Sequence, residues 1–285
     1  MSGGFLVAVA DFTARFWGVR GSIATPGPET ARYGGNTSCI EVRCGPHLLI
    51  FDAGTGIRPL GVELAGRPPF HADLFLTHTH HDHVGGLPFF APAYDARNDI
   101  LIWEGHLGPD TDLHEVMTML MVPPLFPIPP TLIEKSCHYR KFIAGDTLEP
   151  QPGIRIRTAP LNHPNNATAY RVEYGGRSLC LVTDTEHRGG GPDPVVVELA
   201  RGADYMIYDS SFSDEEYPRF RGWGHSTWQE ACRVAEAAGV GAAVLFHHDP
   251  SHDDAAMDAI AAAAQAMRPG TLTAREGMVL DLARP

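Results

Sequence analysis

The stretch that most constrains this sequence is THTHHDHVGG at residues 77–86, where four histidines and one aspartate fall within six positions. It follows the apolar run ADLFL at residues 72–76 and ends in a pair of glycines. A short apolar run bounded by turn residues is typical of a buried strand. Packing alone gives no reason to gather polar side chains at the end of such a strand, because buried polar groups without partners cost free energy. We therefore interpret them as ligands.

The spacing of these side chains predicts two neighbouring metal sites. In an extended chain, residues two apart project to the same side, so His78 and His80 can converge on one point beyond the strand. Asp82 and His83 follow as the chain turns towards the glycines, and they form a second group beside the first. Imidazole nitrogens and carboxylate oxygens are ligands for zinc, and also for manganese or iron.

The composition is that of a globular protein and narrows the class of partner. Of the 285 residues, 44% are hydrophobic and 20% are charged, which is close to the average for soluble domains. The formal charge of −12 disfavours an extended nucleic-acid-binding surface, because phosphate binding requires clustered lysine and arginine. A small anionic substrate, neutralised locally by metal, remains compatible with this charge.

Cysteine usage and hydropathy point to a cytoplasmic protein. The cysteines are odd in number, scattered and without a CxxC pair, which argues against both a disulfide framework and a thiolate zinc site. No apolar stretch reaches the ~18 residues that a membrane span requires. The opening MSGGFLVAVADF has neither a basic region nor a cleavage site, so we interpret it as a strand and not as a signal peptide.

Further along the chain, apolar strand-like runs alternate with helical patterns. The predicted strands lie in HLLIFDAG, DLFLTHTH, ILIWEG, GIRIRTAPLNH, AYRVEYGGRSLCLVTD, DYMIYDSS and AAVLFHHD, with EYGGRS as a hairpin turn. The predicted helices cover residues 56–65, 194–201, 227–238 and 253–267. Ser226 or Thr227 and Asp253 are the expected N-caps of the last two. This mixture predicts sheets covered by helices in one domain, residues 1–285.

One segment, residues 109–133, interrupts this alternation. It contains DTDLHEVMTMLMVPPLFPIPP, a methionine-rich helical piece followed by five prolines. One interpretation is a rigid, partly buried loop, and the other is a lid, a substrate wall or the interface of a homodimer, because long irregular insertions are often functional. The sequence leaves these interpretations open.

HTHHDH followed by Val-Gly-Gly resembles the HxHxDH signature of the metallo-β-lactamase superfamily. The resemblance implies an α/β (α+β) fold, a four-layer αββα sandwich, with two divalent metal ions at the edge of the sheets. Further elements arrive in the order of that family: His163 in APLNHP, Asp184 in LVTDTE, and His247 and His248 in VLFHHDP. Zinc is the first choice for both ions, with manganese or iron as alternatives.

The resemblance also implies which residues hold each ion. The first ion takes His78, His80, His163 and Asp184, and the second takes Asp82, His83, Asp184 and His247. His247 is preferred to His248 because it comes first after the apolar run AAVLF. Asp52 in IFDAGTG resembles the first-motif aspartate of the family and would hold the ligand loops by hydrogen bonds. A simple turn aspartate is nearly as good an interpretation.

Two later motifs indicate the branch of the family. YDSSF and GHSTWQEA resemble motifs of the ribonuclease Z-like phosphodiesterases, and the aspartate at position 184 disfavours antibiotic hydrolysis because many true β-lactamases use cysteine at the second metal. Asp209 stands where that branch has glutamate, which leaves its pairing with His225 open. FWGVRGSIATPG and YGGNTSC resemble the opening of hydrolases described as cyclic-nucleotide phosphodiesterase-like. Arg20 and Asn36 could line the site. For Arg20, an equally good interpretation is that it donates hydrogen bonds to the backbone carbonyls of the glycine-rich loop.

The resemblance therefore implies a metal-dependent phosphodiesterase acting on a small phosphodiester such as a cyclic nucleotide. Two cations would lower the pKa of a shared water, and His225, oriented by Asp209, would act as general acid, with Asp82 as the third catalytic residue. The alternatives are a tRNA 3′-processing endonuclease of the ribonuclease Z type and a thioester or lactone hydrolase. A non-enzymatic metal-binding module is disfavoured because every expected ligand is present. No membrane partner is expected, and a homodimer is an open option.

Overall fold

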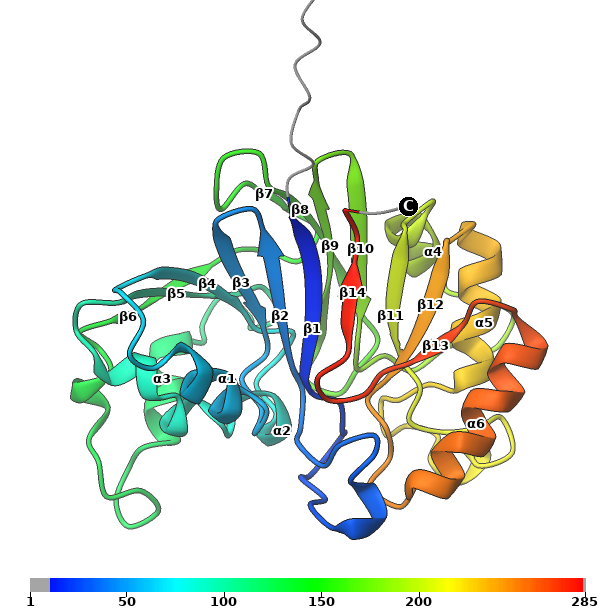
Figure 1. Cartoon of the computed structure of the whole chain (residues 1–285), viewed down its shortest axis with the longest axis horizontal. Helices are drawn as coiled ribbons and strands as arrows, with labels where there is room; N and C mark the ends of the chain where they lie inside the picture. Colours follow the sequence, from blue (N-terminus) through cyan, green and yellow to red (C-terminus); the bar gives the residue numbers. More distant parts are fainter. Residues whose placement is uncertain (1–10, 284–285) are drawn as a thin grey trace, which may run out of the picture.

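A computed structural model describes residues 11–283 of the chain. Within them, two seven-stranded mixed sheets pack face to face, and helices cover the outer face of each sheet (Figure 1). The predicted four-layer αββα sandwich is thereby confirmed.

Apart from β14, which lies beside β1, neighbouring strands in each sheet are consecutive in the chain. The first sheet contains β14 (Val279–Asp281), β1 (Phe12–Gly18), β2 (Cys39–Cys44), β3 (His47–Phe51), β4 (His71–Phe75), β5 (Asp99–Glu104) and β6 (Cys137–Lys141). The second contains β13 (Leu272–Thr273), β12 (Ala242–Phe246), β11 (Tyr205–Asp209), β10 (Arg177–Val182), β9 (Ala167–Tyr174), β8 (Arg155–Leu161) and β7 (Thr147–Leu148).

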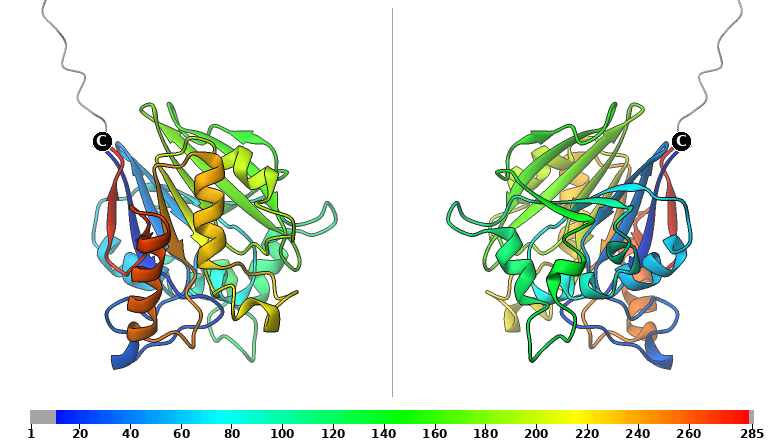
Figure 2. Two further views of the ribbon diagram at one scale, coloured as in Figure 1. Left: turned by 90° about the vertical axis from the view of Figure 1, so that its right-hand side faces the viewer. Right: turned by 90° about the vertical axis from the view of Figure 1, so that its left-hand side faces the viewer.

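The helices divide between the two outer layers. Their bounds are α1 (Ile57–Leu64), α2 (His81–Val84), α3 (Leu113–Met119), α4 (Pro194–Ala200), α5 (Trp228–Ala238) and α6 (Asp254–Met267). Helices α1 and α3 pack on the first sheet, and α4, α5 and α6 lie on the side of the second sheet (Figures 1 and 2). The single-turn α2 carries the histidine-rich motif at the edge of the sandwich.

Alternation along the strands builds the three apolar layers of the core. In β3, Leu49 and Phe51 point into the core between the sheets, whereas Leu48 and Ile50 point towards α1. The central strands are buried on both faces, so they appear in the sequence as continuous apolar runs. This is why those strands were predictable from hydropathy.

The topology brings the predicted ligands to one edge. Strands β3, β4, β5 and β6 are mutually parallel, and so are β10, β11, β12 and β13. Strand β8 runs in the same direction as β10, because both pair antiparallel with β9. The carboxyl ends of parallel strands meet at one edge of a sheet, which is where open α/β sheets bind ligands.

Most predicted elements are present, with the expected caps. The four predicted helices correspond to α1, α4, α5 and α6, and the side chains of Thr227 and Asp253 cap the last two. The EYGGRS hairpin joins β9 to β10. Strands β1, β2, β6, β7, β13 and β14 were not predicted. Strands β7, β13 and β14 are only two or three residues long, β6 carries polar side chains at a sheet edge, and in β1 and β2 polar residues interrupt the apolar run. The strand expected at the start lies largely in residues 1–10, outside the described residues.

The segment 109–133 is partly buried. Leu113, Met117 and Ile133 are buried against the outer face of the first sheet, whereas Leu125 is 82% exposed. Its role as a lid or a dimer interface stays a prediction. In residues 11–283, no helix combines the length and the apolar character that crossing a membrane demands. The cytoplasmic location likewise stays a prediction.

The core between the sheets predicts a clear difference between two truncations. Leu181 is 1% exposed and lies in that core, so Leu181→Ala should lower the free energy of unfolding by about 2–5 kcal/mol through lost transfer energy and cavity formation. Val62 on α1 is 62% exposed, and Val62→Ala should change the free energy of unfolding by less than about 0.5 kcal/mol. Urea denaturation of both variants measures the difference, and equal effects would contradict the assignment of Leu181 to the core.

Candidate metal centre

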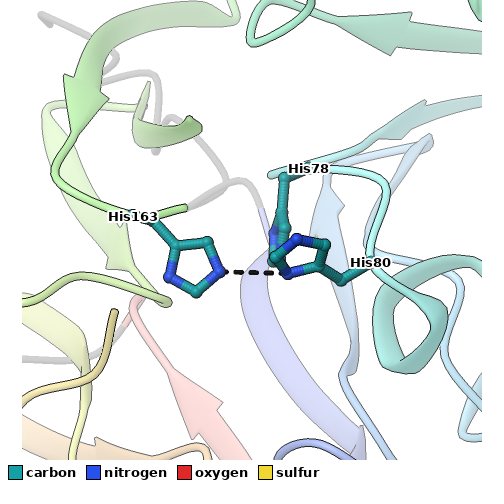
Figure 3. Close-up of side chains that lie close together, drawn as sticks. All are labelled: His78, His80 and His163. Atoms are coloured by element: carbon teal, nitrogen blue, oxygen red, sulfur yellow. Dashed lines mark hydrogen bonds between the residues drawn. The ribbon is translucent and has the colours of Figure 1, made fainter. Parts of the chain in front are cut away.

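Three histidines from two different sheets converge on one point. His78 and His80 follow β4 of the first sheet, and His163 follows β8 of the second. His80 Nδ1 lies 2.8 Å from His78 Nε2 and 3.1 Å from His163 Nε2. Figure 3 shows the three rings directed towards one another, with the dashed line joining His163 and His80. The three nitrogens form a candidate site for one cation, as predicted from the sequence.

A second group of ligand atoms lies beside the first. His83 Nε2 is 3.3 Å from Asp82 Oδ2 and 3.2 Å from Asp184 Oδ1. His247 Nε2 is 3.3 Å from both Asp82 Oδ2 and Asp184 Oδ2. These four side chains form the candidate site for a second cation.

Asp184 connects the two groups. Its Oδ2 atom lies 3.7 Å from His78 Nε2 and 3.8 Å from His163 Nε2, while the same carboxylate faces His83 and His247. A carboxylate in this position faces both groups and could help to hold an ion in either. The structure thus places all seven predicted ligands together, and their role in binding metal stays a prediction.

The donor atoms fit divalent cations. His83 Nε2 is buried and has no hydrogen-bond partner in the described part of the chain, while its Nδ1 is 2.7 Å from Asp52 Oδ2. Leaving a buried nitrogen unpaired costs free energy unless something coordinates it. Histidine and carboxylate donors that converge from several elements are the ligand set that zinc, manganese and iron accept.

Hydrogen bonds behind the ligands fix their orientation. The Asp52 carboxylate accepts from the Thr77 amide at 2.8 Å and the Ser38 hydroxyl at 3.0 Å, in addition to its contact with His83. His163 Nδ1 donates to the Gly224 carbonyl at 2.7 Å, which leaves its Nε2 lone pair free for a metal. Asp52 is therefore more than a turn residue, because it holds the loop that carries the histidine motif.

Three of the strand-end residues adopt a left-handed backbone conformation. Asp52, Asp184 and His247 have φ angles of 63°, 60° and 61°. Residues with a Cβ rarely adopt such angles, and the cost of about 1–3 kcal/mol is tolerated mainly where the surrounding structure fixes the residue for function. All three lie where a strand ends at the candidate metal centre.

His225 stands next to both groups and is held by Asp209. Its Nδ1 is 2.9 Å from Asp209 Oδ2, and its ring stacks on that of His247 at 4.8 Å between centroids. Ser211 Oγ lies 2.8 Å from Asp209 Oδ1 and 3.0 Å from His247 Nδ1, so the hydroxyl links the carboxylate to a candidate ligand. The pairing of Asp209 with His225, which the sequence left undecided because aspartate is shorter than glutamate, is therefore present.

The charges of the centre act strongly on one another. Burial lowers the pKa of His225, but the neighbouring carboxylates, Asp209 first and then Asp184 and Asp82, raise it to about 9. Burial raises the pKa of Asp184, but His247 and His83 outweigh it and hold that pKa well below its ordinary value. Before any cation binds, the ion pairs among these side chains already favour ionised carboxylates.

The amino-terminal loop covers the second group, although Arg20 and Asn36 do not face it. The Ser22 amide donates to Asp82 Oδ2 at 2.7 Å. Arg20 is fully buried and donates to the carbonyl groups of Gly34, Asp249 and His252. Asn36 bonds the Glu276 carboxylate through its side chain. The expectation that Arg20 and Asn36 line the site is therefore replaced by a structural role, and sequence reasoning missed the Ser22 amide.

Two other histidines of the motifs lie outside the ligand groups. His248 Nε2 is 2.9 Å from the Ala274 carbonyl, and burial lowers the pKa of His248 to about 3. The structure therefore places His247, and not His248, in the centre. His81 lies within the HTHHDH motif but is exposed.

Sequence reasoning also missed a buried histidine beside the motif. His106 is 5% exposed, and its Nε2 lies 3.1 Å from Thr79 Oγ1. Thr79 stands in the sequence between His78 and His80, the first two predicted ligands. It follows β5, just as the ligands follow β4, β8, β10 and β12. Searching the end of every predicted strand for polar residues would have found it in ILIWEGHL.

The chain matches a known family over most of its length. The family model described as beta-lactamase superfamily domain matches residues 47–248. Among curated proteins, ribonuclease Z of Myxococcus xanthus is 26% identical over 271 residues, covering 76% of this chain and 83% of the relative. Ribonuclease Z of Mycobacterium marinum is 28% identical over 266 residues, covering 80% of this chain and 84% of the relative.

Solved structures share the fold at lower identity. The metallo-beta-lactamase fold protein YhfI from Bacillus subtilis has a TM-score of 0.71 at 17% identity and covers 95% of this chain and 99% of its own. The short form of human tRNase Z has a TM-score of 0.68 at 20% identity, covering 95% and 99%. A diphosphatase of the PhnP family has a TM-score of 0.69 at 15% identity, covering 94% and 96%.

The two ligand groups predict the metal content of the protein. Purified wild-type protein should contain about two divalent transition ions per chain, and Asp184→Ala should lose most of both because its carboxylate faces both groups. His83→Ala should lose about one ion, whereas His81→Ala, in the same motif but exposed, should keep both. Inductively coupled plasma mass spectrometry measures the content, and a metal-free wild type after supplementation would refute the centre.

Proposed function

The chain belongs to the metallo-β-lactamase superfamily, in its ribonuclease Z-like branch, and from that premise we propose that this metal-dependent hydrolase is a phosphodiesterase. The observation that carries the proposal is the pair of His225 and Asp209, 2.9 Å apart and next to both candidate ligand groups. Cleavage of a phosphodiester requires a proton donor for the leaving oxygen as well as an activated water. The pair supplies such a donor.

The side chains of the two groups would hold two divalent ions. When bound, the ions would supply an activated water at neutral pH and offset negative charge on the phosphoryl oxygens. The side chains around the ligands orient them. Asp184 and Asp82 keep the imidazole nitrogens of His83 and His247 directed towards the centre. Asp52 fixes the ring of His83, and the Gly224 carbonyl fixes the ring of His163. Such fixed groups need no reorganisation during the reaction.

His225 is placed to protonate the leaving oxygen. Its Nδ1 donates to Asp209, so the proton available for transfer is the one on Nε2. The same imidazolium, near Asp184 and Asp82, also offsets charge that develops at the phosphoryl group. Asp82 would help to hold the second ion and contacts His247, so we keep it among the catalytic candidates.

A small phosphodiester, such as a cyclic nucleotide, is the preferred substrate. The net charge of −12 opposes a long polyanion. The segment 109–133, which extends beside the sandwich, contains three acidic residues and no lysine or arginine, so it cannot clamp an RNA backbone by charge. A substrate with a single phosphodiester avoids this repulsion.

The second candidate is a tRNA 3′-processing endonuclease. It is favoured by the curated relatives, which are named ribonuclease Z and match most of their length. A thioester or lactone hydrolase would use the same activated water at carbon. A thioesterase has weaker support because a thiolate leaving group has little need of a proton from His225, and a lactonase has weaker support because the curated relatives are named ribonuclease Z.

A panel of substrates ranks these candidates. We expect the purified, metal-loaded protein to hydrolyse bis-p-nitrophenyl phosphate and either 2′,3′- or 3′,5′-cyclic nucleotides with a higher kcat/KM than it cleaves precursor tRNA, because the acidic protein repels the longer anion. Efficient cleavage of precursor tRNA would reverse the order. Hydrolysis of a thioester or a lactone, without any phosphodiesterase activity, would reject both phosphodiester candidates.

The general-acid role of His225 predicts an effect that depends on the leaving group. His225→Ala should lower kcat by roughly 10²–10⁴-fold for a diester that expels a sugar hydroxyl, because an alkoxide needs a proton. The loss should be smaller when p-nitrophenolate leaves, because that anion is stable without one. Metal content, measured on the same preparation, should remain at the wild-type level. Equal losses for both leaving groups would indicate that His225 acts only by its charge.

A further inference from the structure

An exposed tryptophan lies next to the candidate metal centre and has no part in the proposed chemistry. Trp223 is 63% exposed and belongs to the loop between β11 and α5. Trp17 and Trp103, in contrast, are buried. Exposing a large aromatic ring forgoes the free energy of its burial, and tryptophans are enriched on surfaces that bind partners.

The backbone on both sides of Trp223 is held in place. The Glu186 carboxylate accepts hydrogen bonds from the Gly222 amide at 2.8 Å and the Gly224 amide at 2.9 Å. Both glycines have φ angles near 90°, a conformation that residues with a Cβ rarely adopt. Tyr217 donates its hydroxyl hydrogen to the same carboxylate at 2.8 Å. The tryptophan is therefore presented from a fixed turn.

A chain of aromatic rings supports the indole on one side. The Trp223 ring meets Phe220 edge to face at 5.4 Å between centroids, and Phe220 stacks on Phe212 at 4.3 Å. Phe212 in turn lies 6.2 Å from the ring of His225. This support restricts the rotation of the indole, and its exposed surface remains available for contact.

The loop is joined directly to the metal centre. Gly224, the next residue after Trp223, accepts the hydrogen bond from His163 Nδ1 at 2.7 Å through its carbonyl. A Cβ added to Gly224 would lie 2.4 Å from the same nitrogen, so the backbone is packed against the ring of a candidate ligand. Neighbouring Cα atoms are about 3.8 Å apart, so the Cα atom of Trp223 lies only one residue from the backbone that contacts His163. This separation is within the length of a single nucleoside.

Two cationic side chains lie close to Trp223 in the sequence. Arg219 and Arg221 both precede it in PRFRGWGH, in a protein whose net charge is −12. In residues 11–283, neither arginine takes part in an ion pair, and Arg221 lies over the Tyr217 ring at 5.6 Å. An aromatic ring accompanied by arginines is the combination with which proteins bind the bases and phosphates of single nucleotides.

We propose that Trp223 stacks on the nucleobase of the substrate and thereby selects nucleotide phosphodiesters over diesters without a base. This inference rests on the proposed phosphodiesterase function and specifies its substrate class. A single aromatic side chain preceded by two arginines is too small for a stable protein interface, which buries roughly 1,200–2,000 Å² in total. It has the size and the chemistry for one base.

Two chromogenic esters with the same leaving group test the proposal. Thymidine 5′-p-nitrophenyl phosphate carries a base, and methyl p-nitrophenyl phosphate carries none. Trp223→Ala should raise KM for the thymidine ester by roughly 10- to 100-fold, because stacking on one base contributes about 1–3 kcal/mol. It should leave kcat/KM for the methyl ester within about twofold, and Trp223→Phe should retain most of the affinity, because phenylalanine also stacks.

The matched control is Val62→Ala, which truncates an exposed apolar side chain on α1, outside the loop between β11 and α5. This variant should change neither KM nor kcat/KM for either ester. Equal losses on both esters in Trp223→Ala would show that the loop only supports the centre, and no loss on either would show that the base is not contacted. A change in sedimentation of Trp223→Ala, without a change in KM, would assign the tryptophan to an interface between copies of the chain.

A binding measurement separates this inference from the proposed function. If the wild type cleaves neither ester, the phosphodiesterase proposal fails, and titration with thymidine monophosphate then tests the base contact alone. Stacking should quench the tryptophan fluorescence of the wild type and leave that of Trp223→Phe nearly unchanged, because the other tryptophans are buried or partly buried. Equal quenching in both proteins would overturn the contact.

Discussion

The structure depends on one electrostatic requirement, the neutralisation of buried donors that face one another. The carboxylates of Asp82 and Asp184 and the rings of five histidines meet in a space with little access to water. Buried charges and unpaired nitrogens are costly unless they are paired or coordinated, and His83 Nε2 makes no hydrogen bond in the described residues although the Asp82 and Asp184 carboxylates face it. Divalent cations meet this requirement. The left-handed strand ends, the Asp52 carboxylate and the Gly224 carbonyl all orient the donors towards the positions such ions would take.

The two halves of the sandwich are each incomplete without the other. The first sheet supplies the HTHHDH motif, and the second supplies His163, Asp184 and His247. These groups meet only when the inter-sheet core has formed, because their strands are held together by the apolar side chains between the sheets. Binding of cations by these groups would therefore be linked to folding, and it would stabilise the assembled sandwich to an extent set by the affinity of the ions for the folded state.

The parts of this arrangement that could be predicted from the sequence are those with a local signature. Strands buried on both faces give continuous apolar runs, and polar residues at their ends, such as His163 and Asp184, indicate the edge where a site forms. The order of motifs in the family then allowed the ligand groups to be predicted. Contacts made by the backbone have no such signature, and the Ser22 amide on Asp82 and the Gly224 carbonyl on His163 depend on how distant loops pack. Arg20 was ambiguous for the same reason, because only packing shows which carbonyls surround it.

The shorter acid at position 209 illustrates how a departure from a family pattern can be compensated within the fold. Both carboxylate oxygens of Asp209 are used: Oδ2 contacts His225 and the Thr185 amide, and Oδ1 contacts the hydroxyl and amide of Ser211. An aspartate loses less side-chain entropy than a glutamate when it is fixed, because it has one rotatable bond fewer. It therefore holds His225 firmly from a strand end that lies close enough to reach it. Because Ser211 also contacts His247, the same carboxylate connects His225 to the second candidate ligand group, so one hydrogen-bonded unit positions both.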